Sequence, residues 1–151
     1  MSAINYTGIQ DALEALLLAD TRTNVAKIFV ESEPQFDLMG AQQVIAVFLT
    51  GRTAPAGEQV LSQGKRTRML LKMPIWVIAF SIDSYRRACE LRNTLLGNLE
   101  LVLMDNKTIG GTVATSWLEG GDMVSAHDGQ GGMWTAGAES LLVAEVSAVN
   151  T

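Results

Sequence analysis

The sequence predicts an α+β domain: a mainly antiparallel, twisted sheet with a short N-terminal helix and one long helix packed on one face. Three observations predict it. Two segments repeat apolar residues with the period of a helix, one near the N-terminus and one after residue 84. Several other segments alternate, or run apolar, over strand-like lengths. A long connection over residues 52–64 lacks any helical period, which favours antiparallel strands on either side of it.

The N-terminal helix is predicted to begin near Thr7. Thr7 and Gln10 have the spacing of a capping box. The apolar residues that follow fall on one helical face; they are Ile9, Leu13, Leu16 and Leu17. Asp20 and Thr21 end the helix.

Three strands are predicted next. Val25–Glu31 alternates, as a half-buried strand does. Val44–Leu49 is continuously apolar, which fits a strand buried on both faces. Arg66–Ile82 is the longest strand-like stretch, with basic residues along one face of its first half. Pro74 cannot donate a ladder hydrogen bond, so a bulge or an edge position is expected there.

The second half of the chain begins with the long helix, from Tyr85 to about Met104, capped by Asp83 or Ser84. A strand is predicted over Thr112–Leu118 and a final strand over Ser140–Val149. The segment Glu119–Ala138 between them is rich in glycine and therefore conformationally permissive.

Length and composition bound the function. The 151 residues are the length of a single domain, predicted to span residues 1–151. Charged residues make up 18% of the chain, a low share that indicates surfaces covered by neighbouring subunits. The net charge of −5 excludes an overall basic footprint for nucleic acid. The longest apolar runs are far shorter than the ~20 residues of a membrane helix, and the N-terminus does not read as a signal peptide.

No constellation for catalysis, a metal or a cofactor stands out. Gly57, Gly64 and Lys65 depart from the spacing of a phosphate-binding loop. His127 beside Asp128 is the one pair with acid–base potential. Cys89, the single cysteine, falls on the apolar face of the long helix. We therefore expect no catalytic, metal or cofactor site, and a small-molecule-binding or hydrolytic domain that uses His127 is kept as the alternative.

Two features are candidate contact surfaces. A basic cluster on the longest strand is either a solvated face or a docking surface for an acidic neighbour or nucleic-acid phosphates; its members are Lys65, Arg66, Arg68 and Lys72. Met133 and Trp134, amid glycines, are either packed into the core or form an exposed apolar anchor.

The order of these features resembles the tail terminators of long-tailed phages, also called tail completion or tail-to-head joining proteins. A short helix is followed by a loop-separated pair of strands, QVIAVFLTG and RTRMLLKMPIWVIAF. A strand end then feeds a long helix, SIDSYRRACELRNTLLGNLELVLMDN. A strand ending in Trp117-Leu118 and the final LLVAEVSAV complete the order, so the resemblance covers nearly the whole chain.

The resemblance implies a structural virion protein. Such proteins form a ring, commonly a hexamer, that caps the tail tube, stops its polymerisation and joins the head connector or stopper, while DNA passes through the lumen. It implies a place in the tail or neck of the virion, assembly in the host cytoplasm and no membrane partner. A head-completion or stopper protein, another neck protein and a tail-tube subunit are the structural alternatives.

Within that resemblance, we expect contacts between subunits or rings on the Arg52–Lys72 arm and the Glu119–Ala138 segment. The predicted interface residues are Arg52, Lys65, Arg66, Arg68, Lys72, Met133 and Trp134.

Overall fold

The computed structural model describes residues 3–31, 43–53, 67–126 and 133–148. Over these residues the chain forms two helices and a seven-stranded sheet. The elements in chain order are α1 (Tyr6–Ala19), β1 (Lys27–Val30), β2 (Gln43–Val47), β3 (Gly51–Thr53), β4 (Thr67–Ser81), α2 (Tyr85–Asp105), β5 (Thr115–Glu119), β6 (Met123–Ala126) and β7 (Trp134–Ala148).

The sheet is built around two long central strands, β4 and β7. Each has 15 residues, and they pair antiparallel from Thr67↔Ala148 to Ser81↔Trp134. The strand order is β1-β2-β4-β7-β5, with β3 also pairing with β4 and β6 also pairing with β7. All pairs are antiparallel except β1 with β2. The predicted α+β class with a mainly antiparallel sheet is confirmed.

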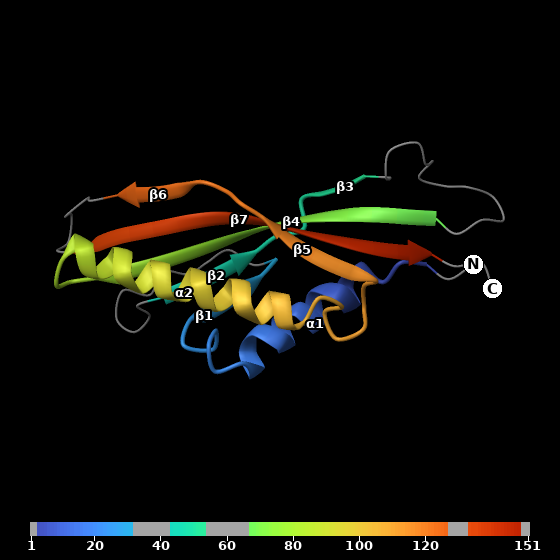
Figure 1. Cartoon of the computed structure of the whole chain (residues 1–151), viewed down its shortest axis with the longest axis horizontal. Coiled ribbons are helices and arrows are strands. Elements are labelled where there is room, and N and C mark those ends of the chain that lie inside the picture. Colours follow the sequence, from blue (N-terminus) through green and yellow to red (C-terminus); the bar gives the residue numbers. More distant parts are fainter. Residues whose placement is uncertain (1–2, 32–42, 54–66, 127–132, 149–151) are drawn as a thin grey trace.

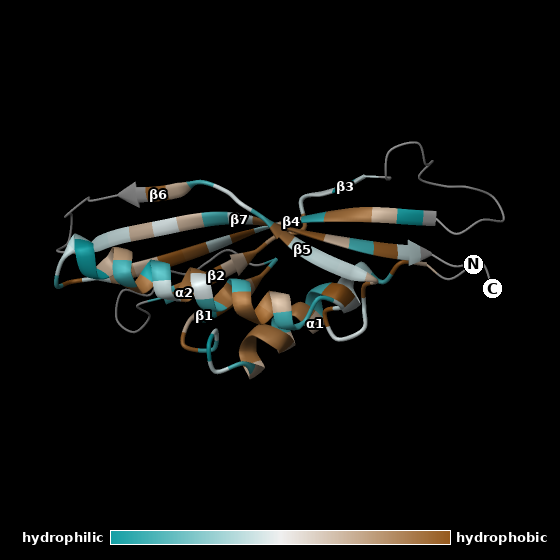
Figure 2. Ribbon diagram, viewed as in Figure 1, coloured by the Kyte–Doolittle hydropathy of each residue, from teal (hydrophilic) through white to brown (hydrophobic). Residues whose placement is uncertain are grey.

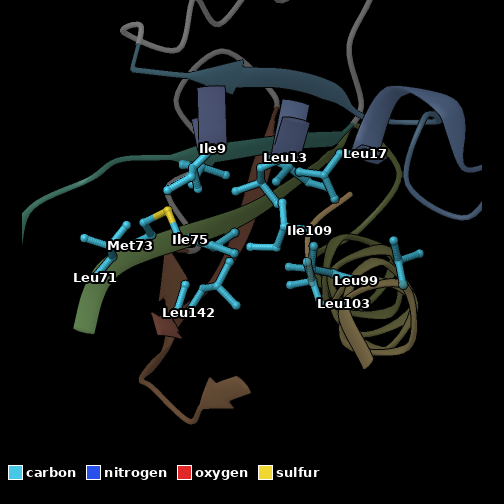
Figure 3. Close-up of a cluster of buried hydrophobic side chains, with 14 of the residues drawn as sticks. Ile9, Leu13, Leu17, Leu71, Met73, Ile75, Leu99, Leu103, Ile109 and Leu142 are labelled. Carbon is cyan, nitrogen blue, oxygen red and sulfur yellow. The ribbon is translucent and has the colours of Figure 1, made fainter. Parts of the chain in front are cut away.

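Both helices lie on one face of the sheet (Figure 1). Alternate residues of β4 point towards them, and Leu71, Met73 and Ile75 are at most 1% exposed. Figure 3 shows how side chains from α1, α2, β4, β7 and the turn after α2 meet between the layers; those labelled are Ile9, Leu13, Leu17, Leu71, Met73, Ile75, Leu99, Leu103, Ile109 and Leu142. The apolar periodicity of both helices is therefore explained by burial against the sheet.

The cap of α1 differs from the prediction. Asn5, not Thr7, is the N-cap, and its side-chain oxygen accepts a hydrogen bond from the Gly8 N–H at 2.8 Å. Asparagine is among the strongest N-cap residues. Thr7 already lies inside the first turn, so its spacing to Gln10 is not a capping box. For α2 the predicted cap is confirmed at Ser84, whose hydroxyl accepts from the Arg87 N–H at 3.0 Å.

Pro74 lies opposite a bulge, as predicted, although the bulge is in the neighbouring strand and not in β4 itself. Between the pairs Val47↔Ile75 and Gly51↔Lys72, three residues (48–50) stand against only Met73 and Pro74. The β4–β7 register passes through Pro74↔Leu141 without a break. Its carbonyl oxygen accepts from the Phe48 N–H at 3.1 Å, in the stretch that separates β2 from β3. Because both backbone groups of a strand residue point to one side, the missing N–H of Pro74 faces this interruption. An interior strand therefore tolerates the proline.

β7 begins six residues before the predicted final strand, and β6 lies inside the glycine-rich segment. The early part of β7 carries Ala136, Gly137 and Ala138, which pair with β4 on one side and with β6 on the other. Alanine and glycine are depleted in strands. The segment forms a strand because it pairs with the apolar residues of β4, although its own sequence has a weak strand propensity.

Neither helix in the described part of the chain is long and apolar enough to cross a membrane.

Candidate subunit-contact surface

The charged residues of the sheet are separated by sign. Strands β1 to β4 carry only basic charged residues, whereas β5 and β7 carry only acidic ones, over the residues that the structure describes. The basic set is Lys27, Arg52, Arg68 and Lys72, and the acidic set is Glu119, Glu139 and Glu145. Because β1, β2, β3 and β4 form one half of the sheet and β7, β5 and β6 the other, the sheet has a basic half and an acidic half. A surface with two unlike halves favours contact with an oppositely charged neighbour.

The described residues of the predicted basic cluster, and Arg52 with them, differ in how available they are to other molecules. Arg68 pairs within the chain, with its Nε 2.6 Å from Glu145 Oε1. Arg52 donates to the Tyr6 hydroxyl at 2.9 Å, and its guanidinium lies 5.7 Å from the centre of that ring. Lys72 is exposed. Lys65 and Arg66 lie outside the described residues.

Met133 and Trp134 lie far from that cluster. Both are half-buried, and Trp134 opens β7 opposite Ser81. Arg68 and Trp134 are near opposite ends of a 15-residue strand pair, a separation of about 45 Å at strand spacing. Among the described residues, the structure therefore does not bring Arg68 and Trp134 together into one site.

A groove between the last turns of α2 and the edge strand β5 was not predicted from the sequence. It encloses about 510 Å³ and is lined by Glu100, Leu103, Met104, Lys107, Thr115, Ser116, Trp117, Leu118, Glu119, Gly120, Ser140 and Leu142. Met104 and Trp117 are 63% and 41% exposed. Figure 2 shows that α2 turns from hydrophilic at its start to hydrophobic towards this end. Exposed large apolar side chains beside a groove are typical of an interaction site.

Small side chains account for the groove. Ser116 and Ser140 are buried where larger residues would fill the space under α2. The Ser116 hydroxyl donates to the Lys107 carbonyl at 2.8 Å, which fixes β5 to the turn after α2. Met104 and Trp117 belong to separate elements, and nothing in their spacing along the sequence showed that both line one groove.

The buried face of α2 contains one charged residue, Arg92, which is 8% exposed. Its Nε and Nη2 donate to Asn93 Oδ1 at 3.1 and 3.0 Å. Its Nη1 is buried without a hydrogen-bond partner. A buried cation with an unpaired donor is costly, so Arg92 is a weak point of the helix–sheet contact.

Groups of residues with metal-binding potential are absent from the described ranges, where no three His, Cys, Asp or Glu side chains cluster. Cys89 is half-buried on α2. His127 and Asp128 lie outside the described residues, so the hydrolytic alternative stays untested.

The fold and its surfaces define an α+β domain with two unlike sheet edges and a groove at one of them. No protein-family model matches the chain. No curated protein matches it either. Among solved structures, the chain is similar to the sheath/tube terminator of an extracellular contractile injection system, PVC, seen by cryo-EM in the extended state. The TM-score is 0.50 with 13% identity, over 99% of this chain and 59% of that one.

This similarity concerns the fold. The chain spans about three fifths of the length of that terminator. The terminator-like architecture expected from the order of elements is therefore confirmed at the level of the fold.

Proposed function

We propose that this protein is a structural tail terminator: it caps a tail tube and stops its polymerisation. The observation that carries the proposal is the fold shared with a sheath/tube terminator over 99% of the chain. The exposed charged and apolar side chains at the sheet edges support it, because contacts between subunits are made by such side chains. The low share of charged residues points the same way.

In this proposal, copies of the chain form a ring, commonly of six, on the last ring of the tube. A ring needs a heterologous contact, in which two different surfaces of one copy meet its two neighbours. The ring would then present the surface that joins the head connector or stopper, and DNA would pass through the lumen. The net charge of −5 is compatible with a lumen that does not hold DNA, since like charges repel.

The interface residues proposed from the sequence remain proposals: Arg52, Lys65, Arg66, Arg68, Lys72, Met133 and Trp134. The ion pair with Glu145 changes how Arg68 is tested. Reversal of Arg68 removes a contact inside the chain, so an effect on assembly must be separated from an effect on stability. Lys72 is the cleaner probe because it is exposed.

Tube-length control tests the function directly. Purified tube subunits are allowed to polymerise with and without this protein, and tubes are measured by electron microscopy. We expect shorter tubes that carry a ring-shaped density at one end. Tubes of unchanged length with bare ends would contradict the function, and binding to a purified head connector without binding to tube ends would identify a stopper instead.

A further inference from the structure

The two edge strands β3 and β5 end the same rows of paired residues. In one row, Gly51 pairs with Lys72, Lys72 with Val143, and Val143 with Trp117. The row thus crosses the sheet from β3 through β4 and β7 to β5. Figure 1 shows β3 and β5 on either side of the β4–β7 pair. The β3 edge and the β5 edge therefore lie at the same level along the β4–β7 pair.

Lys72 reaches from this row towards the β3 edge. Directly paired residues project from one face, and Lys72 is out of phase with the buried Leu71 and Met73, so the row faces away from the helices. Gly51 has no side chain to cover the edge. A Cβ atom at Gly51 would lie 3.7 Å from Lys72 Cβ and 3.9 Å from its Cδ. The lysine stem lies over the glycine, which aims the ammonium group across β3.

Trp117 and Glu119 offer the complementary group at the other end of the row. Trp117 is 41% exposed on the same helix-free face. Its Nε1 donates to Glu119 Oε1 at 3.4 Å, which holds the carboxylate beside the ring. An indole face and a carboxylate together bind an ammonium group through cation–π and charge attraction.

We propose that Lys72 of one copy docks against Trp117 and Glu119 of the next copy, with β3 edge against β5 edge. The proposal deepens the terminator function, on which it rests for the ring. A two-fold contact through either edge would bring like charges together, Lys72 on Lys72 or Glu119 on Glu119. The head-to-tail contact instead joins Lys72 at the β3 edge of one copy to Glu119 at the β5 edge of the next.

Complementary charge reversal tests this contact. Self-association is measured by sedimentation velocity over a concentration series for Lys72→Glu, Glu119→Lys, their equimolar mixture and the double variant. Each single reversal is expected to weaken association about tenfold or more. The mixture and the double variant should regain most of it, because each restores opposite charges across every contact. Trp117→Ala should weaken association roughly 30-fold, as for a central aromatic contact.

Lys27→Glu is the matched control, because it makes the same charge change on an exposed lysine of the basic half, on β1. It should leave association unchanged. Association of the reversed variants at wild-type strength, failure of the mixture to recover, or a wild-type chain that stays monomeric up to its solubility limit and on tube ends would each overturn the contact.

The tube-length assay separates this proposal from the function. Normal capping by both single reversals would refute the contact and leave the terminator function standing. Absence of capping by the wild-type chain would refute the function itself.

Discussion

The two faces of the sheet differ in what covers them. On the helix-covered face, β4 presents Leu71, Met73 and Ile75, which are at most 1% exposed beneath α1 and α2. On the helix-free face, the neighbouring residues of the same strand include the exposed Lys72 and the half-buried Trp76 and Ile78. In β4, the side chains on the helix-covered face therefore stabilise the fold, whereas those on the helix-free face are accessible to a neighbouring molecule. Mutations that disturb assembly without disturbing folding should therefore be sought on the helix-free face and its edges.

The largest expected effect comes from truncating the helix-covered face. Leu71→Ala should lower the free energy of unfolding by about 2–5 kcal/mol, because it leaves a cavity in a fully buried site. Urea denaturation monitored by circular dichroism measures it. Leu70→Ala is the matched control, since the same change falls on the half-buried opposite face and should cost less than half as much. Equal losses of stability at both positions would contradict the difference in burial between the two faces.

The cap of α1 gives a smaller effect on the helix-covered side. Asn5→Ala should cost about 1 kcal/mol of unfolding free energy, because the Gly8 N–H loses its acceptor. Thr7→Ala should change little, since Thr7 does not cap the helix. Thermal unfolding of the two variants side by side decides between the caps, and a larger loss for Thr7→Ala would restore the capping box.

Arg92 is a charged residue among the apolar side chains between α2 and the sheet. It tests whether a buried charge lowers the stability of that contact. Arg92→Met should raise the free energy of unfolding by about 1 kcal/mol, because an apolar side chain of similar length removes the unpaired buried donor. Chemical denaturation measures the change. A loss of stability would show that the guanidinium makes a favourable contact in the folded protein.

The smallest effect concerns the link between the ends of the two helices. Arg22 bonds Asp20 and also Asp105, at 2.9 and 3.1 Å. The hydrogen bonds from Arg22 lower the pKa of Asp20 to about 2 from its ordinary 3.8. A lowered folded-state pKa stabilises the fold above pH 3.8, and this stabilisation is lost as the pH falls towards 2.

Asp20→Asn removes that dependence. Its unfolding midpoint should fall less than that of the wild type between pH 4 and pH 2, where the Asp20 carboxyl takes up its proton. A thermal melt at each pH measures the difference. The effect is small because the groups are near solvent, and identical pH profiles for the two proteins would exclude this role of Asp20.

Periodicity alone determined the strongest elements. Helix α2 from Tyr85 and the long strand β4 follow from repeated apolar spacing, because burial against one layer imposes that spacing directly on the sequence. The strand β2, buried from Val44 to Val47, likewise follows from its apolar run. The fold class follows from the order of these elements.

The remaining strands depend on contacts between segments that are distant in the sequence. Strands β3 and β6, and the first part of β7, exist because partners in β4 and β7 pair with short or small-residue segments that have weak propensity of their own. The groove beside α2, and the row that links Lys72 to Trp117, join residues of separate elements. The register of the strands determines which of these residues lie next to each other. No local sequence pattern encodes the register between distant segments.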